Sequence, residues 1–203
     1  MHISIKSNVK EITRGLNRLQ KKQIPFATML ALNDAASEIS MKYLRKEADR
    51  KFDGGATAFT KRGFKYTKAS KTNLTASVYI DDIQSEYLQY QIDGGTRRPK
   101  SKVIAAPGYN TRLNRYGNVS NANRKKYWSK SDKYKTDRSG IYERQGRGKA
   151  SKWIKVLNFI KFAVYRPKFP YYRLVRDYMG DRAVGFRPKF ERRLSQALKT
   201  SKK

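Results

Sequence analysis

Residues 23–52 read QIPFATMLALNDAASEISMKYLRKEADRKF and hold the longest amphipathic pattern in the chain. Apolar side chains recur there at helical spacing, at Leu32, Ala36, Ile39 and Tyr43. Pro25 suits a first helical turn, where no backbone N–H is needed, and the glycine pair at 54–55 suits the stop. We therefore predict one long core helix that buries a single face and carries no chemistry of its own.

Positive charge dominates the composition of this 203-residue chain. The chain has 47 lysines and arginines against 16 aspartates and glutamates, which gives a net charge of +31. A free monomer with this excess repels itself and attracts polyanions, so we expect nucleic acid or an acidic protein surface as a partner. The charge is uneven, because residues 53–96 are neutral whereas residues 97–152 carry +14. A hydrophobic content of 38% is low for a compact globule, so we also expect an arm that becomes ordered against a partner.

Several classes of protein are excluded or disfavoured by what the sequence lacks. It contains no cysteine, which excludes disulfides, thiolate metal sites and thiol nucleophiles. Residues 1–12 lack the apolar stretch of a signal peptide, and no run of about 18 apolar residues occurs. We therefore expect neither secretion nor a membrane partner.

The remaining patterns predict an α+β fold. Alternation predicts strands at 2–7 and 74–80, with a brief strand at 103–106 that Pro107 ends, and residues 141–144 and 153–159 flank a glycine-containing turn as a β-hairpin would. Helices are predicted at 9–22, 61–65 (a single turn), 85–92, 171–179 and from Pro188 onward. We expect one domain over residues 1–203, with a mixed, mostly antiparallel sheet packed by helices and a C-terminal helical extension at 166–203.

Residues 108–139 differ in character from the rest of the chain. Lysine and arginine are interleaved with tyrosine and tryptophan, and no apolar period of 2 or 3.6 residues is present, so we predict a long basic loop without regular structure that projects as an arm. Cations release counterions from phosphates and aromatic rings stack on bases, which suits contact with DNA; an acidic protein surface and plain disorder are the alternatives. The candidate contact residues are Arg112, Arg115, Arg124, Lys125, Lys126, Trp128 and Lys130.

Residues able to perform catalysis are sparse. The only histidine, His2, lies at the N-terminus, where an exposed strand-edge position is the simplest reading. The acidic residues after the central strand, Asp81, Asp82, Glu86 and Asp93, are read as helix caps rather than as ligands of a metal-dependent nuclease. The glycine pairs lack the context of a phosphate-binding loop. We therefore predict no catalytic residue, no metal or cofactor site, and no enzymatic activity.

An ordered set of short motifs resembles the phage minor tail protein Z family of tail-completion, or neck, proteins. The first motif is formed by Gln23, Pro25, Phe26 and Ala27, followed by Leu32, Asn33 and Ala36, and a later one runs over residues 87–99 and contains Gly94 and Gly95. Between and beyond them, the family pattern is also matched around Phe59 and Gly63, along 74–80, at 140–144 and at 190–198. The likeness covers nearly the whole chain apart from residues 108–139.

The resemblance implies a structural virion protein at the head–tail junction, assembled in the host cytoplasm. Members of the family look like components of a ring, expected to be hexameric, that completes the tail and lets it join the filled head. The implied partners are further copies of the chain, neighbouring neck and head–tail connector proteins, and tail-terminator or tail-tube proteins, with non-specific contact to genomic DNA. The alternative reading is a soluble monomer that binds nucleic acid without sequence preference.

Overall fold

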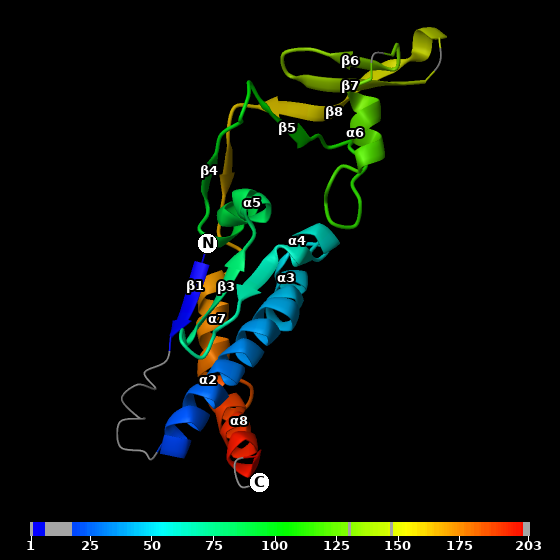
Figure 1. Cartoon of the computed structure of the whole chain (residues 1–203). Coiled ribbons are helices and arrows are strands. Elements are labelled where there is room, and N and C mark those ends of the chain that lie inside the picture. The colour runs from blue at the N-terminus through cyan, green and yellow to red at the C-terminus, as the bar shows by residue number, and fades with distance from the viewer. Residues whose placement is uncertain (1, 7–17, 130, 147, 201–203) are drawn as a thin grey trace.

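The computed structural model describes residues 2–6, 18–129, 131–146 and 148–200. The molecule is elongated, with a helical body at one end and a small β-sheet module at the other (Figure 1). We call residues 104–160 the distal module and the remaining described residues, apart from a connecting ribbon, the body. Within the described residues, no helix is both long and apolar enough to cross a bilayer.

One continuous helix forms the spine of the body. It consists of α2 (Arg18–Glu38), the π-helical segment η1 (Ile39–Tyr43) and α3 (Leu44–Lys51). The predicted helix at 9–22 lies outside the described residues up to position 17, and its last residues belong to α2. The prediction that Pro25 opens the long helix is wrong, because Pro25 lies inside α2. The predicted stop is confirmed, since Gly54 and Gly55 follow with positive φ angles of 74° and 86°.

The π-helical segment changes which residues of the spine face inward. Along α2 the buried residues come in adjacent pairs four positions apart, at 27/28, 31/32 and 35/36, and Ile39 and Ser40 continue this pattern. The extra residue per turn then moves the next buried side chain to Leu44, five positions after Ile39. The Ser40 hydroxyl then donates a hydrogen bond of 2.9 Å to the backbone oxygen of Phe64. A polar side chain can lie in the core here because its hydrogen bond is satisfied.

The spine packs against a three-stranded antiparallel sheet and two helices that follow its strands. The sheet has the order β1-β3-β2, formed by β1 (His2–Lys6), β3 (Thr75–Ile80) and β2 (Phe64–Thr67). Helix α4 (Ala58–Arg62) precedes β2 and α5 (Asp82–Ile92) follows β3. The strand predicted at 74–80 and the helix predicted at 85–92 are thus confirmed to within a few residues, and so is the strand predicted at 2–7 over its described residues. The helical turn predicted at 61–65 lies earlier, at 58–62, and strand β2 follows where a loop was predicted.

Two C-terminal helices complete the body core. Helix α7 (Tyr171–Gly180) buries Tyr171, whose hydroxyl donates to the backbone oxygen of Val78 at 3.0 Å. The largest fully buried side chains of this core come from the spine, the sheet, α5, α7 and the segment leading into α7: Leu32, Ile39, Leu44, Phe64, Val78, Ile80, Leu88, Phe169, Tyr171 and Val175. Within the predicted extension at 166–203, Phe169 and helix α7 are therefore part of the core, and residues 201–203 lie outside the described residues.

Helix α8 (Phe186–Thr200) runs antiparallel along α2 and is held by a ladder of charged pairs. Asp34 accepts two hydrogen bonds from the Arg193 guanidinium, at 2.7 and 2.9 Å. One turn later, Glu38 pairs at 3.0 Å with the Lys189 ammonium, which is buried to 6% exposure. Ala27 and Ala31, fully buried, precede these acids on the same face at helical spacing and allow close approach of the two helices.

A two-stranded ribbon connects the body to the distal module. The ribbon pairs β4 (Gly95–Arg97) with β9 (Ala163–Tyr165), and the segments next to these two strands lead into the distal sheet. That sheet has the order β5-β8-β7-β6, formed by β5 (Ile104–Pro107), β8 (Lys152–Ile160), β7 (Gly140–Gln145) and β6 (Tyr134–Thr136). The predicted hairpin is confirmed as β7 and β8, and β5 ends at Pro107 as expected. The α+β class is confirmed, with the antiparallel strands divided among three sheets.

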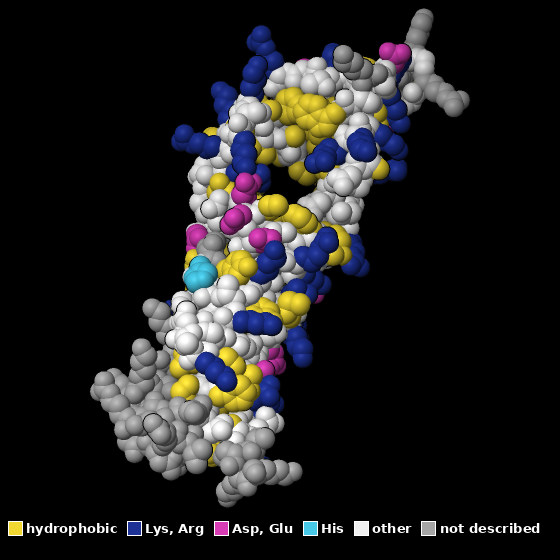
Figure 2. Space-filling view, in the orientation of Figure 1, with side chains coloured by type: hydrophobic (Ala, Val, Ile, Leu, Met, Phe, Trp, Pro, Cys, Tyr) yellow, Lys and Arg dark blue, Asp and Glu magenta, His cyan; other side chains and the backbone are white. Residues whose placement is uncertain are grey.

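Besides the ribbon, a second contact joins the distal module to the body. Residues 113–119, which we call the latch loop, form a tight turn closed by a bridge between Leu113 and Val119. The tip of the turn lies against the glycine pair that ends the spine. A Cβ atom built on Gly54 would meet the Arg115 backbone oxygen at 1.8 Å, so only glycine allows this approach. Figure 2 shows the opening that the ribbon and the latch loop enclose.

Glu38→Gln should lower the free energy of unfolding by about 1–3 kcal/mol, because the buried Lys189 ammonium would lose its charged partner. Urea denaturation of the full chain measures the change. The matched control is Glu191→Gln, which breaks the exposed pair between Arg187 and Glu191 at 2.8 Å and should change the free energy by less than about 0.5 kcal/mol. Equal losses in the two variants would contradict a special role for Glu38.

The Glu38 contribution should also depend on pH. Burial of Glu38 raises its pKa, but the hydrogen bond and charge of Lys189 outweigh burial and lower the pKa below its ordinary value of 4.5. The stabilisation is therefore fully present above that value and is lost as the pH falls through the lowered pKa. The difference between the native chain and Glu38→Gln should shrink in acid, and a difference that grows in acid would contradict this assignment.

Gly54→Ala should destabilise the chain more than Gly117→Ala does. Both glycines have a positive φ, 74° and 71°, so both substitutions carry the same backbone strain of roughly 1–2 kcal/mol. Only at Gly54 does the new methyl group also collide with the latch loop. Hydrogen exchange should show faster exchange of the amides at 113–119 in Gly54→Ala. Equal stability and equal exchange in the two variants would show that the latch loop does not need this contact.

Candidate nucleic-acid interface

The segment predicted to be an arm without regular structure is folded in the distal module, so that prediction is wrong. Residues 108–139 contain the latch loop, helix α6 (Asn121–Tyr127) and strand β6. Ser120 caps α6 by accepting a hydrogen bond of 3.2 Å from the Asn123 backbone N–H. These elements are too short to show a sequence period, yet the segment does project from the body (Figure 1).

The distal module has a small core of its own, which uses part of the aromatic set. Tyr127, Ile141, Val156 and Leu157 are buried there, apart from the body core. The Tyr127 and Tyr134 rings meet edge to face at 5.7 Å, and Trp128 stacks on Phe159 at 5.9 Å. Burial and the negative charge of Glu143 raise the pKa of Tyr127 and of Tyr134. Tyr127 and Tyr134 thus pack on protein, which leaves them little surface for a base.

The predicted contact residues do not form one surface. Arg124, Lys125 and Lys126 are exposed in the last turn of α6, where their charge also suits the carboxyl end of the helix. Arg115 belongs to the latch loop and lies over the Tyr116 ring at 4.6 Å. Arg112 lies beside Tyr127, and Lys130 is outside the described residues. The α6 cations and the neighbouring Trp128, which is 54% exposed, therefore form the part of the prediction that stays together.

The face of the distal sheet opposite α6 presents a second basic and aromatic surface. Register places Lys135, Tyr142 and Lys155 side by side on three adjacent strands. Two residues farther along the hairpin, Arg144 and Trp153 are paired, so they share that face. We call these five residues the open face.

Residues of the open face alternate with those that face α6. Tyr134, Glu143 and Ile154 lie on the α6 side, where Tyr134 meets Tyr127. Trp153 is 43% exposed, and Lys135 and Arg144 are exposed, so no described element covers the open face. This surface is not evident from the sequence, because the patterns at 141–144 and 153–159 predict a hairpin but do not fix which side chains of adjacent strands share a face.

Few carboxylates balance the charge of the distal module. Within its described residues, the ion pair is that of Lys133 with Glu143 at 3.1 Å, and it raises the pKa of Lys133. On the open face, the Lys155 ammonium lies over the Tyr142 ring at 5.2 Å and donates to the Ser139 hydroxyl at 3.0 Å. Figure 2 shows lysine and arginine side chains around a hydrophobic patch on this part of the molecule.

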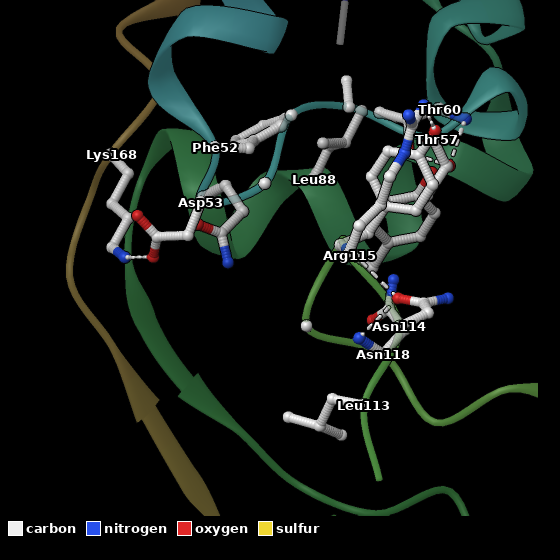
Figure 3. Close-up of a pocket in the computed structure, with 17 residues that line it drawn as sticks. Phe52, Asp53, Thr57, Thr60, Leu88, Leu113, Asn114, Arg115, Asn118 and Lys168 are labelled. Carbon is white, nitrogen blue, oxygen red and sulfur yellow. Dashed lines mark hydrogen bonds and ion pairs between the residues drawn. The ribbon is translucent and has the colours of Figure 1, made fainter.

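A cavity of about 650 Å³ lies where the latch loop meets the body (Figure 3). Its polar lining is already engaged in the fold. Asp53 pairs with Lys168 at 2.8 Å, the Thr57 and Thr60 hydroxyls bond at 2.9 Å, and the Asn114 side chain accepts the backbone N–H groups of Tyr116 and Asn118. We assign no ligand to this cavity.

Two of the four acidic residues considered as metal ligands are paired with lysines. Asp81 pairs with Lys65 at 2.6 Å and Glu86 with Lys100 at 2.8 Å. Among the described residues, no group of three or more histidine, aspartate and glutamate side chains could hold a metal ion. His2 is exposed on β1, near the Tyr79 ring.

The residues that carry the family likeness act in packing and in turns. The Asn33 side chain both donates to and accepts from the backbone of Ala69, at 3.1 and 2.7 Å. Ala27, Leu32 and Ala36 are buried in the body, and Phe26 lies under the Lys71 ammonium. Gln23 and Pro25 are half-buried in α2, and Gly94 and Gly95 make the positive-φ turn into the ribbon.

The chain matches no known protein or protein family in three comparisons. Searches of protein-family models, of curated proteins and of solved structures found no match for this chain. The likeness to the tail-completion family therefore rests on the motif residues themselves.

Proposed function

We propose that the chain is a structural assembly protein of a tailed-phage neck. In this role it forms a ring, expected to be hexameric, that completes the tail and helps to join it to the head, within the virion and without catalysis. The motif likeness supports this proposal. The body supplies a rigid frame, and the distal module supplies a projecting contact of the kind that links successive subunits head to tail.

The observation that carries the proposal is the basic distal module at one end of an elongated chain. Residues 53–96, which contribute β2, β3 and α5 to the body, are neutral, whereas residues 97–152 carry +14 and residues 153–203, most of which form the C-terminal helices, carry +11. The two-stranded ribbon and the latch loop hold the distal module away from the body core (Figure 1). A subunit built in this way offers a basic surface to something beyond itself, either an acidic neighbour or the DNA that passes through the neck.

The α6 cations are the part of that surface best placed to meet a neighbour. Arg124, Lys125 and Lys126 are exposed and have no carboxylate partner within 4.0 Å among the described residues. These cations are therefore available to contact another molecule. At the rim of an interface they would remain partly hydrated, so the desolvation cost of this contact would be small.

The second candidate is a soluble monomer that binds nucleic acid without sequence preference. The open face favours this candidate, because its cations and its exposed tryptophan could contact nucleic acid without a ring or a neighbouring protein. Negative-stain images and light scattering of the purified full chain separate the two: closed rings support the neck protein, and a monomer at all concentrations supports the alternative.

Reversing the α6 charges should impair assembly. In phage particles made with R124E/K125E/K126E, unjoined heads and tails should accumulate and infectivity should fall, because the basic contact would become acidic. The matched control K42E/K46E/K51E reverses three exposed charges on the spine. Infectivity equal to that of the native chain in the α6 variant, or an equal loss in both variants, would contradict a specific role for α6.

A further inference from the structure

We infer that the open face of the distal sheet is a binding surface for single-stranded nucleic acid. In this assignment Lys135, Arg144 and Lys155 contact phosphates and Trp153 stacks on a base. The inference deepens the proposed function by giving nucleic acid to the open face and leaving the α6 cations to a protein neighbour.

The geometry of the sheet sets the spacing of these groups. Neighbouring strands lie about 4.8 Å apart, and alternate residues of one strand lie about 7 Å apart. Lys135 and Lys155 flank Tyr142 on the adjacent strands, and the pair of Arg144 and Trp153 follows two residues along the hairpin. Arg144 therefore lies beside Trp153 on the adjacent strand and Lys155 lies two residues along the same strand, whereas Lys135 is two strands away from Trp153.

The cations of the open face are available to an external anion. No carboxylate lies within 4.0 Å of the Lys135, Arg144 or Lys155 side-chain nitrogens among the described residues. Arg144 donates to the Ser151 hydroxyl at 3.0 Å, which leaves its other guanidinium N–H groups free to donate. Of the acids near this face, Glu143 pairs with Lys133, and Asp132 lines a hollow together with Arg144. Asp137 accepts two backbone N–H groups and the Ser139 hydroxyl, and these bonds lower its pKa.

The aromatic group decides the class of polyanion. An acidic peptide would be satisfied by the cations alone, whereas a half-exposed indole among cations on an uncovered sheet is the arrangement on which unpaired bases stack. The Tyr142 ring is covered by Lys155 and its hydroxyl bonds to Ser139 at 2.8 Å, so Trp153 is the ring left open. Paired bases are closed to such stacking, so a duplex could use only the phosphate contacts.

Tryptophan fluorescence gives a readout confined to this surface. The chain has two tryptophans, so Trp128→Phe leaves Trp153 as the single reporter, and Trp153→Phe leaves Trp128. Titration of the full-length variants with a single-stranded oligothymidylate should quench Trp153 strongly and change Trp128 little. Trp153→Ala should weaken binding by roughly tenfold in fluorescence anisotropy.

A pair of charge variants tests the phosphate contacts. K135Q/R144Q should weaken binding and reduce the slope of log K against log salt by roughly 1.4, since each lost phosphate contact in a single strand removes about 0.7. The matched control K42Q/K46Q removes two exposed charges from the spine and should leave the slope unchanged. Thermal unfolding of each variant confirms that the distal module is still folded.

Several outcomes would overturn the inference. These are equal quenching of the two tryptophans, equal changes of slope in the two charge variants, displacement of the oligonucleotide by polyglutamate at equal charge, and tighter binding of a duplex without quenching. Because this assay uses the free chain, absence of binding would not contradict the proposal that the chain forms a ring. Absence of rings would likewise not contradict the binding of nucleic acid by the open face.

Discussion

Burial of one face of the spine is the constraint on which the rest of the body depends. The sheet, α5 and α7 have their own apolar residues, and these meet the stripe that runs through Leu32, Ala36 and Ile39. Ile39 and Ser40 lie in the core together at the start of the π-helical segment, and the hydrogen bond from Ser40 to Phe64 ties the spine to β2. Displacing the spine would expose both the largest apolar surface and a polar group that has lost its partner.

The distal module has a smaller hydrophobic core than the body and lies in a strongly basic part of the chain. Its core consists of four buried residues with three more packed against it, and it lies in the region of greatest positive charge. Much of the aromatic content is used to make up for this small core, as the contacts of Tyr127 with Tyr134 and of Trp128 with Phe159 show. The ribbon and the approach of Gly54 to Arg115 then anchor the module at two points.

Sequence reasoning succeeded where a pattern was long enough to show a period. The spine, β3 and the hairpin of β7 and β8 were predicted because their apolar residues repeat over several turns or strand steps. The start of the spine was misplaced because the preference of proline for a first turn was outweighed by packing of α2 against α8.

The candidate site was predictable only in part. The charge of the α6 residues was visible in the sequence, but whether Trp128 faces solvent or Phe159 depends on contacts between residues far apart in the chain. The open face was missed for the same reason. It exists because register aligns residues of β6 with β7 and residues of β7 with β8, and neither alignment can be read from one strand.

The small core and the unbalanced charge of the distal module link its stability to the binding of a polyanion. Mutual repulsion of the cations opposes the compact form, and a bound polyanion removes that repulsion while it binds only the folded surface. A ligand present at about 100 times its dissociation constant would add about 2.7 kcal/mol to the stability of the form that it binds. A module this lightly packed gains a large fraction of its stability from such a contact. The charge that makes the isolated chain costly to fold is therefore the same charge that makes its folded, partner-bound form the favoured one.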